Sequence, residues 1–501
     1  MNYASTRDKS LSVTSAEAIK TGLAPDGGLF IPKEIPQLTM EDIEALVPLS
    51  YPERAVSILK RYLTDFTEEE IQDCAHSAYN KTKFETEEIA PLYKLNSGLY
   101  FLELWHGPTC AFKDMALQIL PYLLKQSVMK TGETKEIVIL VATSGDTGKA
   151  ALEGFKDVDG TRIIVFYPEN GVSDIQKRQM ITQEGNNVDV AAVFGNFDDA
   201  QSGVKKIFGD KEYAEVLERN NFMLSSANSI NWGRLVPQIV YYFSAYCNLL
   251  KNDEIKPGDS VNFVVPTGNF GNILAAFYAK EMGLPIHKLI CASNENNILT
   301  DFINTGVYDK NREFKTTTSP SMDILISSNL ERFLYHATGG DDVRVAGWMK
   351  ALSEDGWYEV PDVTKAKIKE LFYGGFCDDA KTLATIREEN QKSGYVMDTH
   401  TAVAKQVYEQ YKAETGDETK TVIVSTASPF KFCDSVLTAI AGEEAVSAIS
   451  DEFALLDALA EKTELLVPAP LAGLAAKPVI FTTTCDKTEM YDVVSHMLNL
   501  S

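Results

Sequence analysis

Through the middle of the chain, short runs rich in Val and Ile alternate with stretches of helical periodicity. A run that is apolar on both faces must be buried on both faces, which is typical of parallel strands covered by helices. The pairs of run and helix are 137–142 with 147–155, 162–167 with 173–183, and 261–265 with 272–282, followed by a run at 287–292. The sequence therefore predicts an α/β fold with open, twisted, mostly parallel sheets, which bind ligands at the carboxyl edge of their strands.

Composition limits the classes of function open to the chain. The formal charge of -24 disfavours nucleic acid and anionic membranes as partners, so we expect a small-molecule ligand. No apolar stretch is long enough to predict a membrane span, and residues 1–8 lack the apolar core of a signal peptide. The seven cysteines form no C-x-x-C pair and the six histidines show no metal-ligand spacing. We therefore expect a reducing, cytoplasmic compartment and no bound metal.

The 501 residues allow two or three domains. Residues 1–92 combine a turn-rich start with helical patterns, and we expect them to form a small amino-terminal α/β domain. The alternating region, 93–440, would form two α/β lobes with a ligand between them. The pattern at 443–462 is helical before prolines interrupt it, so residues 441–501 are predicted to form a helical extension.

A compact run of small, aromatic and hydroxyl residues, W-H-G-P-T-C-A-F-K-D at 105–114, contains one lysine, Lys113. Lysine is usually solvated, because burial of an ammonium group costs free energy unless the group loses its proton or is paired. A lysine whose pKa is lowered by burial is a neutral amine, the form that makes a Schiff base with an aldehyde. This segment alone leaves two interpretations equally open, a cofactor-binding lysine and an ordinary lysine at a helix start.

Two strand-to-helix loops have the composition of anion-binding sites. The first, T-S-G-D-T-G at 143–148, would suit a substrate carboxylate, although an ordinary helix cap is the alternative. The second, P-T-G-N-F-G-N at 266–272, is suited to cradle a phosphate with backbone amides. It lacks the Lys-Ser/Thr ending of a nucleoside-triphosphate loop and the spacing of a dinucleotide fingerprint, which disfavours a nucleotide-binding module.

Two further segments carry polar groups after apolar runs. The turn S-T-A-S-P at 425–429 offers a hydroxyl for a heterocyclic nitrogen, although an ordinary Ser/Thr turn is the simpler interpretation. The segment S-A-N-S-I-N-W-G-R at 226–234 offers amides, hydroxyls and a guanidinium for a second anion. The candidate cations for that anion, in falling order, are Arg234, Lys149 and Lys431.

These motifs, in this order, resemble those of the threonine synthase family, specifically its bacterial and fungal branch. The resemblance covers nearly the whole chain. It rests on Y-A-S-T-R, G-L-A-P-D-G-G-L-F-I-P, H-G-P-T-C-A-F-K-D, A-T-S-G-D-T-G, S-S-A-N-S-I-N, P-T-G-N-F-G-N and S-T-A-S-P. It implies fold type II of the pyridoxal 5'-phosphate (PLP) enzymes, similar to tryptophan synthase β. It also implies conversion of O-phospho-L-homoserine and water to L-threonine and phosphate, by γ-elimination and β-hydration.

The resemblance also implies a role for each residue of these motifs. Lys113 would be the catalytic residue and would carry the cofactor as a Schiff base. The cofactor phosphate would be held by Gly268, Asn269, Phe270 and Asn272, and the pyridine nitrogen by Thr426. The substrate would be bound by Thr109, Thr143, Ser144, Gly145, Asp146, Thr147, Asn228, Asn231 and Arg234. Ser428 stands where relatives commonly carry histidine, which leaves the role of that position open.

Two other interpretations of these motifs are open, and the sequence disfavours both. Another PLP lyase, such as a threonine dehydratase or a β-replacement synthase, is disfavoured because the resemblance includes the amino-terminal region and the N-S-I-N segment. A catalytically silent, threonine-synthase-like binding protein is disfavoured because the chain keeps Lys113 and the phosphate loop. The expected assembly is a monomer or a small homo-oligomer, and no obvious additional regulatory domain is present.

Overall fold

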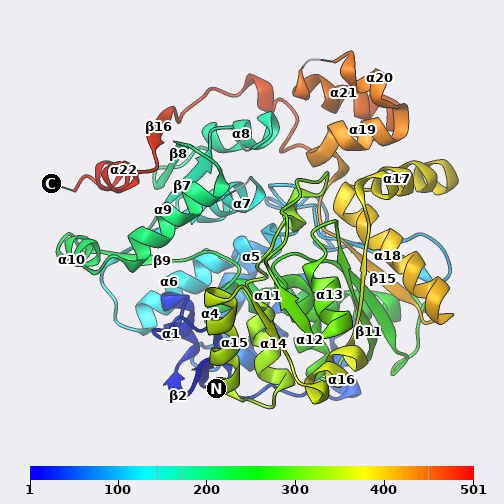
Figure 1. The fold of residues 1–501 in the computed structure, drawn as a ribbon, viewed down its shortest axis with the longest axis horizontal. Coiled ribbons are helices and arrows are strands. Elements are labelled where there is room, and N and C mark those ends of the chain that lie inside the picture. Colours follow the sequence, from blue (N-terminus) through cyan, green and yellow to red (C-terminus); the bar gives the residue numbers. More distant parts are fainter. Residues whose placement is uncertain (144, 171, 450, 501) are drawn as a thin grey trace.

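The computed structural model describes residues 1–143, 145–170, 172–449 and 451–500. Two sheets organise two lobes (Figure 1). The first runs, in sheet order, through β14 (Phe372–Phe376), β11 (Ile286–Ser293), β10 (Val261–Pro266), β15 (Thr421–Ser425), β5 (Leu99–Glu103) and β4 (Leu92–Lys94). The second runs through β16 (Thr483–Asp486), β8 (Val188–Phe194), β7 (Thr161–Pro168), β6 (Glu136–Ala142) and β9 (Phe222–Ser225). Within these two sheets, all neighbouring strands are parallel except β4 and β5, which are antiparallel.

Alternate residues of β6 pack into two different hydrophobic cores. Ile137, Ile139 and Val141 belong to the central core, whereas Val138 and Leu140 pack on the opposite face of the sheet with residues of α9 (Phe197–Gly209). A strand buried on both faces needs apolar residues at every position, which is why its sequence is a continuous apolar run. The predicted α/β fold with mostly parallel sheets is confirmed.

Helices connect and cover these strands. Between β5 and β9 the chain forms, besides α9, the helices α5 (Asp114–Leu117), α6 (Leu120–Lys130), α7 (Asp146–Phe155), α8 (Asp174–Ile181) and α10 (Lys211–Arg219). Between β9 and β11 it forms α11 (Trp232–Lys251) and α12 (Gly271–Glu281). From β11 to the start of the tail the chain forms the helices α13 (Ile298–Thr305), α14 (Leu330–Ala337), α15 (Asp342–Glu354), α16 (Asp362–Leu371), α17 (Asp379–Ser393) and α18 (Thr399–Thr415). The same part of the chain contains the strand pair β12 (Val307–Asp309) and β13 (Trp357–Glu359). It also contains the 3₁₀ turns η1 (Pro320–Met322) and η2 (Pro429–Phe432).

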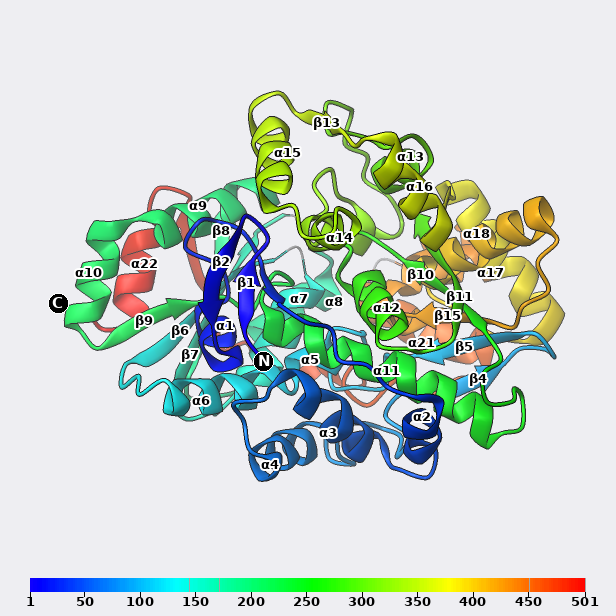
Figure 2. The same cartoon turned by 90° about the horizontal axis from the view of Figure 1, so that it is seen from below.

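The amino-terminal region packs against the central core (Figure 2). It consists of the antiparallel strands β1 (Tyr3–Ser5), β2 (Asp8–Val13) and β3 (Phe30–Pro32), with α1 (Ser15–Thr21), α2 (Met40–Leu46), α3 (Tyr51–Tyr62) and α4 (Glu68–Ala78). The guanidinium of Arg7 donates two hydrogen bonds, of 2.7 and 2.8 Å, to Glu331 of α14. The buried ring of Tyr3 lies 5.4 Å from that of Trp232 at the start of α11. These contacts attach the region to the elements that carry the site.

The carboxy-terminal tail differs from the helical extension predicted for it. It follows α19 (Cys433–Ala441) and contains the helices α20 (Glu443–Ser447), α21 (Glu452–Thr463) and α22 (Met490–Met497), and the turn η3 (Leu474–Ala476). Its segment 483–486, however, is the strand β16, which pairs in parallel with β8 at the edge of the five-stranded sheet (Figure 1). The residues there are Thr-Thr-Cys-Asp, and β-branched residues favour extended backbone. The predicted boundaries at 92 and 440 stay predictions.

In the part of the chain that the structure describes, none of the helices combines the length and the apolar character needed to cross a membrane.

Candidate active site

Lys113 lies directly before α5, and hydrogen bonds hold its segment beside the late turn at 425–429. The amide of Phe112 donates to the carbonyl of Thr426 at 2.7 Å. The amide of Ser428 donates to the carbonyl of Cys110 at 3.0 Å, and Ala111 and Ala427 form an isolated antiparallel bridge. The structure therefore brings together the predicted catalytic lysine and the predicted partner of the pyridine nitrogen, which are far apart in sequence.

The turn before Lys113 is fixed by the carboxylate of Asp114. This carboxylate accepts hydrogen bonds from the amide of Thr109 at 2.8 Å and from its hydroxyl at 2.7 Å. A Cβ atom on Gly107 would lie 2.6 Å from the same carboxylate, so only glycine fits there. Burial raises the pKa of Asp114 to about 7, against the effect of the two hydrogen bonds. Thr109, a predicted substrate contact, thus has its hydroxyl committed to Asp114.

Three charged side chains, Asp146, Arg234 and Lys431, act on the amine of Lys113. Burial is the main cause that lowers the pKa of Lys113, and the cations Arg234 and Lys431 lower it further. Asp146 acts in the opposite direction. Because a lowered pKa increases the fraction of neutral amine, this environment favours the nucleophilic form of the lysine.

The loop after β6 is organised by Thr143. Its hydroxyl oxygen accepts hydrogen bonds from the amides of Gly145 at 3.0 Å and of Gly148 at 2.9 Å. Gly145 has φ +139, and a Cβ atom there would lie 2.4 Å from the amide of Gln176, so the position requires glycine. Ser144, another predicted substrate contact, lies outside the described residues, and Thr147 lies in the first turn of α7.

Asp146 binds other side chains of the protein. Its Oδ1 lies 2.9 Å from Nζ of Lys431 and accepts a hydrogen bond of 3.1 Å from Nε2 of Gln176. Burial alone would raise the pKa of Asp146, but the charges of Lys431 and Lys113 outweigh that effect and lower it. The carboxylate is therefore ionised, and what the loop offers a substrate carboxylate is its backbone amides at the start of α7.

The predicted phosphate loop lies between β10 and α12. Phe270 has φ +62, the left-handed conformation, and α12 starts directly after it. A Cβ atom on Gly268 would lie 3.1 Å from the carbonyl oxygen of Ser321 and 3.2 Å from Cα of Met322, which leaves little room for a side chain. Asn269 is exposed. The amides of the first turn of α12 are oriented as at other phosphate sites at helix N-termini.

Asn272 is an unusual buried residue in this loop. Its Oδ1 accepts hydrogen bonds from the hydroxyls of Tyr241 at 2.5 Å and Tyr242 at 2.6 Å. Its Nδ2, also buried, has no hydrogen-bond partner among the described residues. A buried donor without an acceptor costs free energy, so the site has an unused donor at the position predicted to hold the cofactor phosphate. These residues fit such an anion.

Of the three predicted residues in the 226–234 segment, one has a structural role. Both amide hydrogens of Asn231 are used, by the carbonyls of Ile19 at 3.0 Å and Ser226 at 2.9 Å, and its Oδ1 accepts from the amide of Gly233. It therefore caps α11 and attaches it to the amino-terminal region. Asn228 is partly buried, and its backbone carbonyl accepts from the amide of Asn231.

Arg234 differs from the other candidate cations. It is buried, its Nη1 donates to the carbonyl of Ala227 at 2.5 Å, and its Nε has no partner among the described residues. Burial lowers the pKa of Arg234 to about 10, which still leaves the guanidinium charged at neutral pH. By contrast, Lys149 binds Glu153 and Gln183, and Lys431 binds Asp146. Arg234 is thus the candidate whose charge lacks a carboxylate partner in the described structure.

Several residues of the site were missed in the sequence. Gln176 and Gln179 lie one turn apart on α8, and Gln179 Oε1 accepts a hydrogen bond of 2.7 Å from Lys431 Nζ. Tyr241 and Tyr242 orient Asn272. The i, i+3 spacing of the two glutamines was the available signal for α8, whereas the tyrosines look like ordinary core residues of a long apolar helix.

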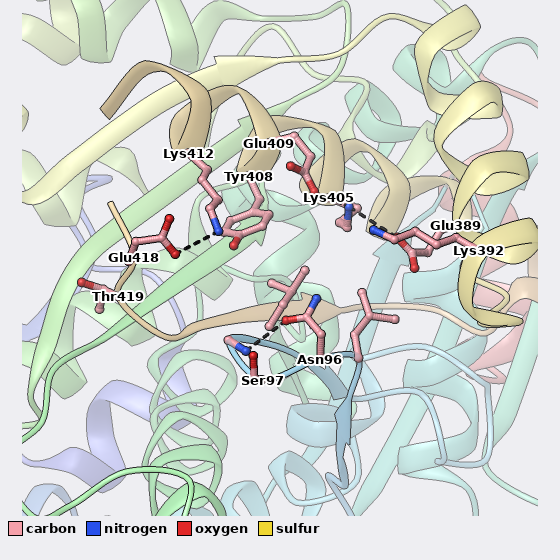
Figure 3. Close-up of a pocket in the computed structure, with 13 residues that line it drawn as sticks. Asn96, Ser97, Glu389, Lys392, Lys405, Tyr408, Glu409, Lys412, Glu418 and Thr419 are labelled. Carbon is pink, nitrogen blue, oxygen red and sulfur yellow. Dashed lines mark hydrogen bonds and ion pairs between the residues drawn. The ribbon is translucent and has the colours of Figure 1, made fainter. Parts of the chain in front are cut away.

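A cleft of about 280 Å³ lies away from Lys113, between α17, α18 and the turn before β5 (Figure 3). Its charged side chains compensate one another: Lys405 pairs with Glu389 at 3.4 Å and Glu409 at 2.5 Å, and Lys412 pairs with Glu418 at 3.2 Å. These pairs make the cleft a weaker candidate for an anionic ligand than the surroundings of Lys113.

Comparisons with known proteins define first the class of protein. A model described as "Pyridoxal-phosphate dependent enzyme" matches residues 55–359. On either side, "Threonine synthase N terminus" matches residues 2–79 and "Threonine synthase, C-terminal" matches residues 401–484. The chain is a member of the threonine synthase family of PLP-dependent enzymes, and fold type II is confirmed.

Individual relatives agree with this family. The chain is 41% identical to human threonine synthase-like 1, over 88% of this chain and 60% of that protein. It is 38% identical to threonine synthase from Pseudomonas aeruginosa, over 88% of this chain and 91% of that enzyme. The crystal structure of PLP-bound threonine synthase from Brucella melitensis matches with a TM-score of 0.88 and 37% identity, over 99% of both chains. The chain thus spans about 60% of the length of the threonine synthase-like relatives that it matches.

Proposed function

We propose that the protein is a threonine synthase, which converts O-phospho-L-homoserine and water to L-threonine and phosphate. The observation that carries this proposal is the surroundings of Lys113. A lysine with a lowered pKa lies near Arg234, whose charge has no carboxylate partner in the described structure. The neighbouring loop holds the unused donor of Asn272. Two separate anion-binding places beside one amine suit a reaction that involves a cofactor phosphate and a phosphorylated substrate.

The residues of the site fit PLP, the cofactor of the family. In this proposal Lys113 binds the aldehyde, Gly268, Asn269, Phe270 and Asn272 hold the phosphate, and Thr426 binds the pyridine nitrogen. When bound, the cofactor withdraws electrons from the substrate and so eases loss of the proton on Cα. A hydroxyl such as that of Thr426 does not protonate the pyridine nitrogen as a carboxylate would, which limits how much charge the ring accepts.

The residues of the chain then have distinct tasks. Once the amino group of the substrate has replaced it on the aldehyde, the neutral amine of Lys113 would remove the proton from Cα of the substrate, and the same group would move protons at Cβ and Cγ. Phosphate leaves from Cγ, and water adds at Cβ, which gives L-threonine. The amides at the start of α7 bind the substrate carboxylate, with Thr143, Gly145, Asp146 and Thr147 shaping the loop and Ser144 kept as a predicted contact.

Among the candidate cations, Arg234 is the proposed ligand of the substrate phosphate. Its guanidinium is buried beside the segment 226–231 and keeps Nε available. Lys149 and Lys431 already bind carboxylates, so a phosphate would have to displace those partners. Asn228 and Asn231 are retained as proposed contacts, and the side chain of Asn231 also caps α11.

The test is release of phosphate from O-phospho-L-homoserine, with L-threonine measured as the co-product. Wild-type protein supplied with PLP is expected to form both in equal amounts, and Lys113→Ala is expected to form neither and to lose the visible absorption of the lysine-bound cofactor. Release of 2-oxobutanoate and ammonia from threonine would instead identify a dehydratase. Failure of the wild-type protein to turn over either compound, with cofactor bound, would identify a silent binding protein.

We also propose a reducing, cytoplasmic compartment and a monomer or small homo-oligomer. All seven cysteines are free and buried, which suits a protein that never meets an oxidising compartment. The surplus of acidic residues favours solubility. Sedimentation of the purified protein tests the assembly, and imaging of the tagged full-length protein tests the compartment.

A further inference from the structure

An ion pair joins the two lobes beside Lys113. Asp146 is the first residue of α7, soon after β6 of the five-stranded sheet. Lys431 lies in η2, soon after β15 of the six-stranded sheet. Nζ of Lys431 and Oδ1 of Asp146 are 2.9 Å apart, and the two side chains are 0% and 4% exposed. The pair therefore forms a buried contact between the two lobes.

Both ends of the pair are completed by glutamines of α8. Gln179 accepts from Lys431 at 2.7 Å, and Gln176 donates to Asp146 at 3.1 Å. Gln176 in turn leaves no room for a side chain on Gly145. A buried ion pair repays its desolvation only when its geometry is good and further hydrogen bonds satisfy it, and both conditions hold here. Each charged group of the pair has a further hydrogen bond to a glutamine, and this bond fixes the position of the charge.

Lys113 lies within the field of both members of the pair. Asp146 raises the pKa of Lys113, whereas Lys431 and Arg234, together with burial, lower it. Lys431 also acts on two neighbours of Lys113, because its charge lowers the pKa values of Cys110 and Asp114 against the effect of burial. Hydrogen bonds join the segment that carries Lys431 to the segment that carries Lys113, since the amide of Phe112 donates to Thr426 and the amide of Ser428 donates to Cys110. Without Lys431, Asp146 would be a buried anion whose charge still acts on Lys113.

We propose that Lys431 is a positioning residue, which binds Asp146 across the lobes and so prevents that carboxylate from holding Lys113 as an ammonium ion. The inference rests on the proposed role of Lys113 as a reactive amine. Lys431 touches neither the proposed substrate nor the cofactor phosphate in this scheme. It acts on the reaction through Asp146, and its effect is on the protonation of Lys113.

The proposal makes opposite predictions for the two members of the pair. Lys431→Met leaves Asp146 uncompensated, so Lys113 should keep its proton to higher pH. Asp146→Asn leaves the cations Lys431 and Arg234, so Lys113 should lose its proton at lower pH. The double variant should lie between them, and Lys431→Arg should behave as the wild type. At a pH well below the pKa of Lys113, lowering that pKa by one increases the fraction of neutral amine by about tenfold.

The measurement is the rate at which cyanate carbamylates Lys113 in the full-length, cofactor-free protein, followed over pH by mass spectrometry of the Lys113 peptide. Only the neutral amine adds to the carbon of isocyanic acid, so the rate, divided at each pH by the concentration of isocyanic acid, reports the fraction of neutral amine. Lys149→Met is the matched control, because Lys149 is another partly buried lysine paired with a carboxylate, Glu153, on the same helix as Asp146. Removal of the Lys149 ammonium group should leave the pH dependence of Lys113 carbamylation unchanged. Thermal unfolding of each variant identifies those that fold.

Shifts of the two single variants in the same direction, or profiles that both match the wild type, would overturn the proposal. If Lys431→Met does not fold, Asp146→Asn alone decides, because a purely structural pair predicts no increase in carbamylation at neutral pH. The outcome is separate from that of the proposed function, since the cyanate assay needs neither PLP nor substrate. A wild-type protein with the expected Lys113 profile but no phosphate release would overturn only the proposed function.

Discussion

The hydroxyl of Tyr242 donates a hydrogen bond of 2.6 Å to Oδ1 of Asn272, and this contact fixes which end of the Asn272 amide stays available. Tyr241 donates to the same oxygen at 2.5 Å. With both hydroxyls on Oδ1, the buried Nδ2 is the atom left without a partner among the described residues. A pair of core tyrosines therefore presents a donor to the phosphate loop.

Removal of both hydroxyls should weaken cofactor binding. In the double variant Tyr241→Phe/Tyr242→Phe, Oδ1 of Asn272 loses its two donors. The side-chain amide is then free to rotate, and Nδ2 is free to donate to another acceptor. The lost orientation and the unsatisfied oxygen are worth about 1–3 kcal/mol, or roughly 5- to 150-fold in the dissociation constant of PLP. Equilibrium dialysis with PLP measures this dissociation constant. Tyr246→Phe is the control, because Tyr246 lies on the same helix but donates to Asp259, and an equal loss of affinity there would contradict the interpretation.

Replacement of Arg234 should act on the substrate more than on the cofactor. Arg234→Met removes the guanidinium, so KM for O-phospho-L-homoserine is expected to rise by about 10- to 100-fold, the typical effect of a lost charged hydrogen bond in a buried site. PLP affinity should change little. Steady-state kinetics of phosphate release provide the measurement, with Lys149→Met as the control. A larger effect in Lys149→Met than in Arg234→Met would assign the phosphate to Lys149 instead.

Asn231→Ala should destabilise the fold. The variant loses the cap of α11 and the two hydrogen bonds to Ser226 and Ile19, at a cost of about 1–3 kcal/mol in the free energy of unfolding. Urea unfolding measures that loss, and Asn228→Ala, with no comparable cap, is the matched comparison. Unchanged stability combined with a raised KM would favour the sequence-based prediction that Asn231 contacts the substrate.

His106 should contribute a pH-dependent part of the stability. Burial opposes its charge, but Glu103 at 2.9 Å and Glu85 at 3.5 Å outweigh burial and raise the pKa of His106 to about 9. Because the folded pKa lies above the unfolded value of about 6.5, the stabilisation is complete below that value and is lost as pH rises towards 9. His106→Gln should remove this pH dependence, which amounts to about 3 kcal/mol in the free energy of unfolding between these two pH values. Equal slopes for the two proteins would show that His106 stays neutral.

The sheets and the loops of the site were largely predictable, because a strand that is buried on both faces is a continuous apolar run in the sequence. The run at 137–142 became β6, and the run at 421–424 became β15, each within one residue of the predicted bounds. Family motifs then located Lys113 and Asn272. The strand β16 was not predictable, since a short edge segment carries no continuous apolar run and its pairing partner lies about three hundred residues earlier.

Roles within the site were harder to predict than its location. Asn231 has the residue type of a ligand-binding amide, yet its three hydrogen-bonding positions are used by the protein. Lys431 and Asp146 were each assigned to ligands, and they bind one another. Sequence gives the inventory of polar groups, but which groups satisfy each other depends on side-chain geometry across two lobes.

The pairing of β16 with β8 also has a consequence for the order in which the protein is made. On the ribosome β8 emerges with one edge unpaired, and the strand that covers it is synthesised about three hundred residues later. Until then the half-finished sheet presents an open edge of the kind that recruits other strands. This lobe therefore closes only after β16 has left the ribosome.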